Sequence, residues 1–265
     1  MKFGLSTLGR LGAALLCGVA LAACSPKKEE AAAPAPKFTI AWSIYAGWMP
    51  WPYAQQAGIV DKWSKKYGVD IDIVQVNDYV ESLNQYSAKK FDGVTAASMD
   101  ALTIPAANGL DSTVMIVGDY SNGNDGVVLK DGTKLADIKG RPVNLVEFSV
   151  SHYLLARALE SANLKPTNVK TVNTSDADIV ASFSASETKA LVTWNPQLST
   201  VKAMKGATEV FNSSKIPGEI LDTLVVNTET LKANPNLGKA LAGIWYETMS
   251  IMSAQTPEGA AAREA

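Results

Sequence analysis

The sequence predicts a two-lobed α/β fold with mainly parallel sheets and a hinged cleft between the lobes. Three observations support this prediction. Short β-prone runs alternate with helical segments through most of the chain, a turn-rich crossover at 119–126 interrupts the alternation, and a late β run at 221–227 could return the chain to the first lobe. Strands that alternate with helices form mainly parallel sheets, and two connections between lobes permit a hinge motion.

The first lobe is expected over 38–120 and 221–265. Pro50 and Pro52 suit the first turn of a helix, Asp78 or Asn77 can cap the next helix, and Gly109 supplies a C-terminal stop. The predicted strands are 38–43, 69–76, 93–97, 113–117 and 221–227, and the predicted helices are 52–67, 79–89, 100–108 and 235–254.

The second lobe, with the crossovers, is expected over 121–220. The predicted strands are 127–130, 142–146, 169–172, 190–194 and 209–211, and the predicted helices are 151–162, 177–184 and 196–204. Ligands of such sheets bind where the carboxyl ends of strands meet the N-termini of helices. We therefore look for ligand contacts at these ends and on the crossovers.

The first 24 residues have the pattern of a secretory signal. Lys2 and Arg10 precede an apolar run at 11–22 that is too short to span a bilayer. The run ends in Leu-Ala-Ala-Cys24, which resembles the lipobox of bacterial lipoproteins and implies a lipid on Cys24. Residues 25–37 lack apolar periodicity and are expected to form a disordered tether. This pattern predicts a protein of the periplasm or cell surface, held at either membrane by its lipid.

The composition leaves little chemistry for catalysis. The formal charge of −2 and the lack of Lys/Arg clusters argue against nucleic acid. Cys17 and Cys24 both lie in the signal segment, and His152 is the only histidine, so no metal site, cofactor or disulfide is expected in the folded part. Nucleophile, phosphate-loop and zinc motifs are absent from the sequence. We expect a monomeric binding protein and no enzyme.

Several segments resemble a known family as a set. The run IAWSIYAGWMPW at 40–51, the run DIKGRPV at 137–143 with SVSHYLL at 149–155, and the strand end at 190–196 resemble the nitrate/sulfonate/taurine group of ABC-transporter solute-binding proteins. Residues 48–51 with 119–125 look most like its urea carboxylase-associated (urea/guanidine) subgroup. The resemblance implies a type II periplasmic-binding-protein fold, solute capture between the lobes, and delivery to a permease with its ATPase. It also implies a C-terminal portion that this chain lacks.

Aromatic and acidic residues of the first lobe are candidates for ligand contact. Tyr45, Trp48 and Trp51 lie within seven residues, and such rings can stack on a planar solute or a cation, although rings of this kind also pack in cores. Asp100 begins a predicted helix, where a carboxylate either caps the helix or attracts a donor-rich cation.

The second lobe offers a carboxylate at a strand end. Glu147 directly follows the strand at 142–146, so we expect it to face the ligand and expect Glu147→Gln to weaken binding of a cation. Ser149 and Ser151 then either cap the next helix or bond the ligand. His152 fits a surface histidine better than a ligand contact.

The strand ends and crossovers supply the remaining candidates. Trp194 and Asn195 end the strand at 190–194, where the indole could cover the ligand and the amide could both donate and accept. Asp222 could complete an acidic site or face solvent on an edge strand. Tyr120 and Asp125 lie on the crossover.

The balance of charge at these positions favours a donor-rich solute. Asp100, Glu147 and Asp222 fall near the cleft, whereas Arg141 sits at a strand start away from it, and an oxyanion would want the opposite balance. The sequence therefore favours guanidinium, urea or a related amine or amide. Uptake of nitrate, sulfonate or taurine, a solute-sensing lipoprotein, and an enzyme of the same fold remain the alternatives.

Overall fold

The computed structural model describes residues 34–265, of which Ala35–Ala265 form one compact unit. The signal segment, Cys24 and the tether up to residue 33 lie outside the described residues. Within 34–265 no helix has the length and apolar character needed to cross a bilayer.

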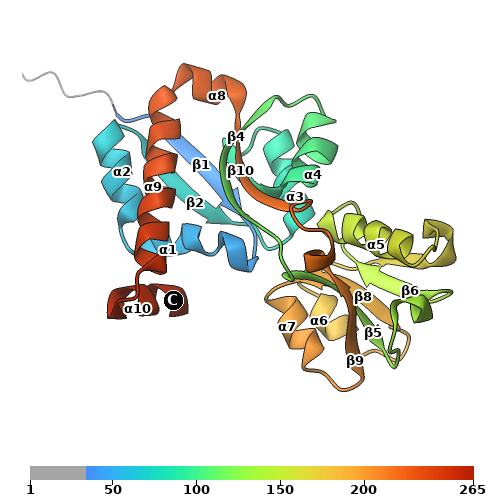
Figure 1. Ribbon diagram of the computed structural model, residues 1–265. Helices are drawn as coiled ribbons and strands as arrows, with labels where there is room; N and C mark the ends of the chain where they lie inside the picture. The colour runs from blue at the N-terminus through green and yellow to red at the C-terminus, as the bar shows by residue number, and fades with distance from the viewer. Residues whose placement is uncertain (1–33) are drawn as a thin grey trace, which may run out of the picture. The chain divides into compact units, whose positions relative to one another are not determined.

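The first lobe is built on a five-stranded sheet with the order β2-β1-β3-β10-β4 (Figure 1). β1 pairs in parallel with β2 and β3, whereas β10 runs antiparallel to both β3 and β4. The strands are β1 (Lys37–Trp42), β2 (Asp70–Gln75), β3 (Gly93–Ala97), β4 (Ser112–Tyr120) and β10 (Leu221–Asn227).

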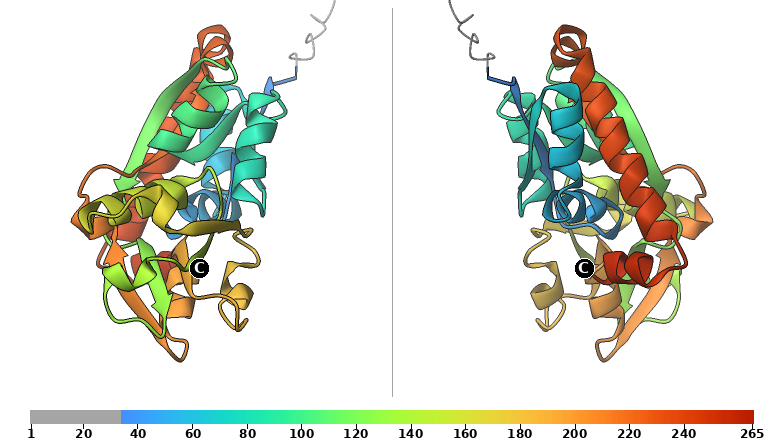
Figure 2. Two further views of the ribbon diagram at one scale, coloured as in Figure 1. Left: turned by 90° about the vertical axis from the view of Figure 1, so that its right-hand side faces the viewer. Right: turned by 90° about the vertical axis from the view of Figure 1, so that its left-hand side faces the viewer.

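Helices cover both faces of this sheet. The long helix α9 packs with α1 and α2 on one face, and α3 and α4 lie on the other (Figures 1 and 2). The helices are η1 (Ala46–Trp48), α1 (Pro50–Gln56), α2 (Ile59–Tyr67), α3 (Tyr79–Ser87), α4 (Ser98–Ala101), the π-helical turn η2 (Leu102–Ala106), α8 (Thr228–Ala233), α9 (Pro235–Ser253) and α10 (Pro257–Glu264).

The second lobe has a five-stranded sheet with the order β7-β6-β8-β5-β9. β6 pairs in parallel with β7 and β8, and β5 runs antiparallel to β8 and β9. Its elements are β5 (Asp125–Lys130), η3 (Leu135–Ile138), β6 (Pro142–Leu145), α5 (Val150–Ser161), η4 (Pro166–Asn168), β7 (Lys170–Asn173), α6 (Ile179–Ser182), β8 (Ala190–Trp194), α7 (Gln197–Lys202), β9 (Ala207–Asn212) and η5 (Ser213–Lys215).

The predicted α/β fold of two lobes is confirmed, but each sheet is mixed and not mainly parallel. In each sheet two strand pairs are parallel and two are antiparallel. The chain leaves the first sheet after β4, enters the second at β5, and returns at β10. β5 and β10 are the first strands after the chain changes sheets. Each runs antiparallel to a neighbouring strand of the sheet that it enters, β5 to β8 and β10 to β3.

Two predicted helices are interrupted. The helix expected at 52–67 is divided into α1 and α2 by Gly58, which has a φ of 72°. Such a positive φ is incompatible with a continuous right-handed helix. The helix expected at 100–108 is a single turn of α4 followed by η2, which contains Pro105. Because proline lacks an N–H, it disturbs the regular hydrogen-bond pattern there.

The contact between α2 and α9 depends on a glycine. A Cβ added at Gly243 would lie 2.2 Å from the Trp63 ring, and the indole Nε1 of Trp63 donates to Glu247 at 2.7 Å. The ring therefore lies flat against the α9 backbone and is fixed at its edge.

We expect Gly243→Ala to lower the free energy of unfolding by roughly 1–3 kcal/mol, because the added methyl forces Trp63 out of its position. The better helix propensity of alanine would act the other way by about 1 kcal/mol. Urea denaturation measures the difference. Lys239→Ala, at an exposed position of the same helix, should change stability by less than about 0.5 kcal/mol. A stabilised Gly243→Ala protein would contradict the packing described here.

Candidate functional site

A small cavity is lined by residues of both lobes. It lies where β1, β3 and β8 end and where α3 and α5 begin, the position at which α/β sheets bind ligands. The free space is about 10 Å³ for the centre of a water-sized molecule, which is roughly the room of one water. Only a solute of a few heavy atoms could enter with small shifts of the walls. The lining residues are Tyr45, Trp48, Tyr79, Ala97, Asp125, Val150, Trp194, Ile220 and Asp222.

Four aromatic rings form a continuous wall of this cavity. The Trp48 ring lies 5.1 Å from that of Tyr45 and 5.3 Å from that of Tyr79, and Tyr79 in turn lies 5.8 Å from Trp194. All four side chains are buried. Flat rings held at such spacing offer stacking faces and cation–π contacts to a planar ligand.

Hydrogen bonds between the lobes hold the cavity shut. The indole Nε1 of Trp194, in the second lobe, donates to the carbonyl of Ile44 in the first lobe at 3.1 Å. The backbone N–H of Val150, the first residue of α5, donates to Asp100 Oδ2 of the first lobe at 2.9 Å. A carboxylate at a helix N-terminus also interacts favourably with the helix dipole. The structure is therefore that of a closed cleft.

A further carboxylate of the second lobe, Asp176, is buried as well. Burial, and after it the charge of Asp78, raises the pKa of Asp176 to about 6.

Two aspartates line the cavity and two more lie beside it, and we call the four the acid cage: Asp100, Asp119, Asp125 and Asp222. Asp222 and Asp125 line it, Asp119 is the cross-strand partner of Asp222 in the β4–β10 ladder, and Asp100 Oδ2 accepts from the Tyr79 hydroxyl at 2.8 Å. Asp100, Asp125 and Asp222 are each 5% exposed or less. Among residues 34–265, no Lys, Arg or His lines the cavity or forms an ion pair with the cage.

Burial without a positive charge raises the pKa values of Asp100, Asp125 and Asp222. Burial raises the pKa of Asp100 to about 7, although hydrogen bonds from Tyr79 and from the Val150 N–H act in the opposite direction. Burial, with the charge of Asp119, raises the pKa of Asp125 to about 6. The pKa of Asp222 is raised well above its ordinary value, first by burial and then by Asp119 and Asp125.

Several buried polar atoms of this site have no partner within the described chain. They are the Tyr45 hydroxyl, the Trp48 Nε1, Asp222 Oδ2 and Asp119 Oδ1. Buried polar atoms are nearly always hydrogen-bonded, so each such group requires an explanation. The carboxylate oxygens without partners are free to accept hydrogen bonds from the donors of a ligand. Within residues 34–265 no group of three His, Cys, Asp or Glu side chains is arranged to hold a metal ion.

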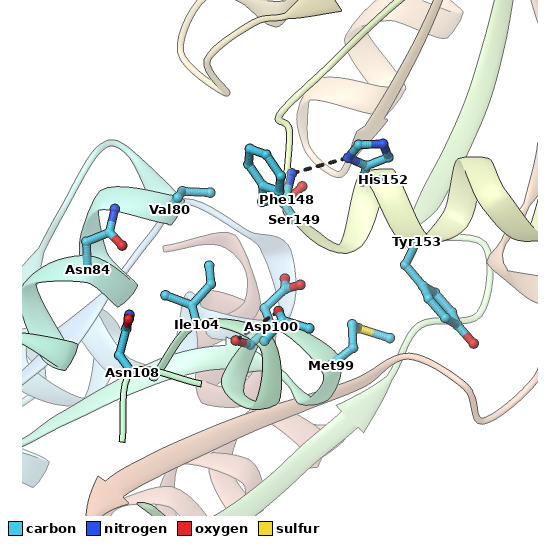
Figure 3. Close-up of a pocket in the computed structure, with 11 residues that line it drawn as sticks. Val80, Asn84, Met99, Asp100, Ile104, Asn108, Phe148, Ser149, His152 and Tyr153 are labelled. Carbon is cyan, nitrogen blue, oxygen red and sulfur yellow. Dashed lines mark hydrogen bonds between the residues drawn. The ribbon is translucent and has the colours of Figure 1, made fainter. Parts of the chain in front are cut away.

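A wider, open pocket borders Asp100 (Figure 3). Figure 3 shows Phe148, Ser149 and His152 on one side of it and Ile104 with Asn108 on the other. Phe148 is 72% exposed, and its N–H donates to His152 Nδ1 at 3.3 Å. Asp100 thus belongs to the wall of the open pocket while its carboxylate bonds the Tyr79 hydroxyl of the inner cavity.

Most of the expected first-lobe residues lie at the cavity. Tyr45, Trp48 and Asp222 line it, as does Trp194 from the second lobe, and Asp100 lies directly behind Tyr79. Their roles toward a ligand remain predictions.

The structure places Glu147 elsewhere, which corrects our expectation. Its carboxylate accepts from the Thr171 hydroxyl at 2.7 Å, and it lines a shallow pocket with Asp78 and Asn173. The cause is local: β6 ends at Leu145, and the positive φ of 64° at Phe148 turns the chain before α5. Val150, not Glu147, therefore reaches the cavity.

Five other expected residues do not line the inner cavity. Trp51 is buried against Trp245 with ring centroids 5.3 Å apart, so it packs in the first lobe. Tyr120 is 52% exposed at the end of β4. Of the rest, Ser149 caps α5 and the Asn195 amide bonds Asn124 and Ser199, whereas the Ser151 hydroxyl is buried without a partner in residues 34–265.

Sequence reasoning missed Tyr79 and Asp119. Tyr79 was expected only as a helix residue, yet its hydroxyl donates to Asp100 and accepts from the Ala97 N–H at 3.0 Å. Its place after a capping aspartate, beyond the carboxyl end of β2, was the available signal. Asp119 meets Asp222 through the antiparallel β4–β10 pairing, which a mainly parallel sheet does not predict.

Comparison with known proteins agrees with this architecture. The alkanesulfonate-binding protein SsuA of Xanthomonas axonopodis pv. citri, solved with MOPS bound, superposes with a TM-score of 0.71 at 17% identity over 87% of this chain and 78% of its own. A binding protein of Brucella abortus is 26% identical over 159 residues, which are 58% of this chain and 49% of the relative. The taurine-binding periplasmic protein of Escherichia coli is 26% identical over 132 residues, which are 48% of this chain and 40% of its own.

The two lobes and the enclosed site define a periplasmic-binding-protein fold. The model of the NMT1/THI5-like family matches residues 53–254, and the chain belongs to that family. It spans about half the length, or less, of the two relatives compared by sequence.

The acid cage should make the ligand-free protein less stable as pH rises. The pKa values of Asp100, Asp125 and Asp222 in the folded protein lie above that of an aspartate in the unfolded chain, so the folded state binds more protons. The free energy of unfolding therefore falls as the pH rises from about 4 through these raised pKa values. Asp222→Asn removes one of the repelling carboxyls. We expect it to reduce the loss between pH 5 and pH 9, measured by urea denaturation, by on the order of 2 kcal/mol.

Asp70→Asn provides the matched control, because Asp70 is an exposed aspartate on β2. Its stability should follow the wild-type dependence on pH. If Asp222→Asn and wild type lost stability in parallel, Asp222 would carry no repulsion in the folded state.

Proposed function

We propose that this chain is the solute-binding component of an ABC importer and that its inner cavity captures a small, donor-rich solute. Guanidinium is the solute that fits best, and urea or a related amine or amide shares part of its chemistry. The observation that carries this proposal is the acid cage: Asp125 and Asp222 line one small cavity, Asp100 and Asp119 lie beside it, and no basic residue of the described chain lines it.

The charge of the cage decides between solute classes. A buried carboxylate without a partner costs several kcal/mol, and a second charge of the same sign raises that cost. A planar cation supplies N–H donors to the free oxygens of Asp222 and Asp119 and offers a flat face to Trp48. Because guanidinium is weakly hydrated, it also loses less on entering a buried site than a compact ammonium does.

The transport role is supported by the relatives. Those compared above are named as binding proteins, and one is named as periplasmic. We propose that a permease and its ATPase receive the solute. We also propose that the protein is a monomer on the outer side of a membrane, to which a lipid on Cys24 anchors it. Loss of uptake on deletion of the gene would separate transport from a sensing role, which needs the same cleft.

Uptake of an oxyanion is the second candidate. It is favoured by the names of two relatives, which bind taurine and alkanesulfonates. The cage argues against it, because its carboxylates would repel such an anion.

The proposal is tested by thermal melts of the protein with millimolar solutes at constant ionic strength. Guanidinium chloride should raise the melting temperature, because a ligand that binds only the folded state stabilises it. Sodium chloride, taurine, nitrate and sulfate should leave the melt unchanged. Stabilisation by taurine without any effect of guanidinium would overturn the choice of solute class in favour of the oxyanion.

Two substitutions locate the binding. Asp125→Asn should raise the dissociation constant for guanidinium, measured by calorimetry, at least about 30-fold, because losing one partner of a buried charge pair costs about 2–5 kcal/mol. Glu147→Gln should leave it unchanged, because the Glu147 carboxylate is bonded to Thr171 outside the cavity. Equal effects of the two substitutions would contradict the placement of the site.

A further inference from the structure

The acid cage contains two carboxyl groups that face each other directly. Asp119 on β4 and Asp222 on β10 are cross-strand partners, and each carries a buried oxygen without a hydrogen-bond partner in the described chain. Asp119 is also confined from the other side, because a Cβ at Gly47 would lie 2.6 Å from its Oδ2. Like charges fixed at such a pair favour a proton shared between them.

Among residues 34–265, no Lys, Arg or His forms an ion pair with Asp119 or Asp222. The titratable groups that face it are Asp125 from β5, Tyr45 from the loop after β1 and, more distantly, Tyr79 from α3. Burial and the neighbouring aspartates raise the pKa of both tyrosines, so their hydroxyls stay neutral. The remaining polar neighbours of Asp125 are the hydroxyls of Ser121 and Ser213.

Other residues that line the cavity also carry polar atoms without partners. The Tyr45 hydroxyl and the Trp48 Nε1 belong to lining residues that are 4% and 6% exposed, and neither atom has a partner in residues 34–265. The acid pair therefore stands beside an enclosed space whose other walls also carry unused polar groups.

We propose that, without solute, the closed cage holds a proton on Asp222 opposite Asp119, and that capture of the cationic solute expels this proton. This inference rests on the proposed function. One cation enters and one proton leaves to solvent, so the charge of the closed site is the same before and after. The cleft can then close both with and without solute, and it does not bury an additional charge when it binds one.

The exchange makes binding depend on pH. Below the raised pKa of Asp222 a proton must be displaced, and the dissociation constant for guanidinium falls about tenfold for each unit of rising pH. Above that pKa Asp222 is ionised and the dependence disappears.

Calorimetry of guanidinium binding tests the exchange. Titrations at pH 7 in phosphate and in Tris, which differ in ionisation enthalpy, should report release of about one proton for each guanidinium bound. The dissociation constant should fall by at least tenfold between pH 6 and pH 8. Asp119→Asn gives the remaining carboxylate an amide neighbour, and its proton release at pH 8 should fall to near zero while binding remains measurable. Asp70→Asn, on the exposed side of β2, should release protons as wild type does.

The outcomes separate the two proposals. Guanidinium binding with no proton release and an unchanged dissociation constant from pH 6 to pH 8 would overturn the exchange and leave the proposed function intact. Absence of binding at pH 9, where the cage is most ionised, would overturn both. If Asp119→Asn does not fold, the two-buffer measurement on wild type still decides the matter.

Discussion

The structure depends on one unusual constraint: the carboxyl groups of Asp125 and Asp222 line a closed cavity, Asp100 and Asp119 lie beside it, and no basic side chain of residues 34–265 lines it. Proteins normally bury an acid only with a partner. Asp100 accepts hydrogen bonds from the Tyr79 hydroxyl and the Val150 N–H, and Asp125 accepts one from Ser121, whereas Asp222 and Asp119 each keep a buried oxygen without a partner in the described chain. Burying these acids lowers the free energy of unfolding of the ligand-free protein. A cationic ligand that neutralises them would recover this free energy as binding energy.

The fold assembles this constraint from segments far apart in the sequence. Asp119 and Asp222 come together across two antiparallel strands of the first sheet, whereas Asp125 begins the first strand of the second sheet. Asp125 is the cross-strand neighbour of Trp194, so the aromatic wall and the acid enter the cavity from adjacent strands. Since the acids lie on both lobes, a ligand that neutralises them favours the closed cleft over the open one.

Much of this could be predicted from the sequence, because strand ends are visible as ends of apolar runs. The predicted strand ends placed Tyr45, Trp48, Trp194 and Asp222 near one another. The lack of basic residues at those ends predicted a negatively charged site. Glu147 shows the limit. It follows a strand, but its carboxylate bonds Thr171, and the left-handed Phe148 after it turns the chain so that Val150 reaches the cavity. Backbone angles of that kind, and the antiparallel pairing that joins Asp119 to Asp222, are decided by the tertiary fold and leave no pattern in the sequence.

The two crossovers between the sheets meet at a pair of serines. The Ser121 hydroxyl lies 2.7 Å from that of Ser213, one on each connection, and Ser121 also donates to Asp125. The Ser213 hydroxyl further accepts from the backbone N–H of Gly123 at 2.7 Å. The two connections between the sheets are therefore joined directly by this serine pair, and one of the two hydroxyls also bonds an acid that lines the cavity. A ligand that changes the charge of Asp125 would consequently act on a hydrogen bond of the segments that link the lobes.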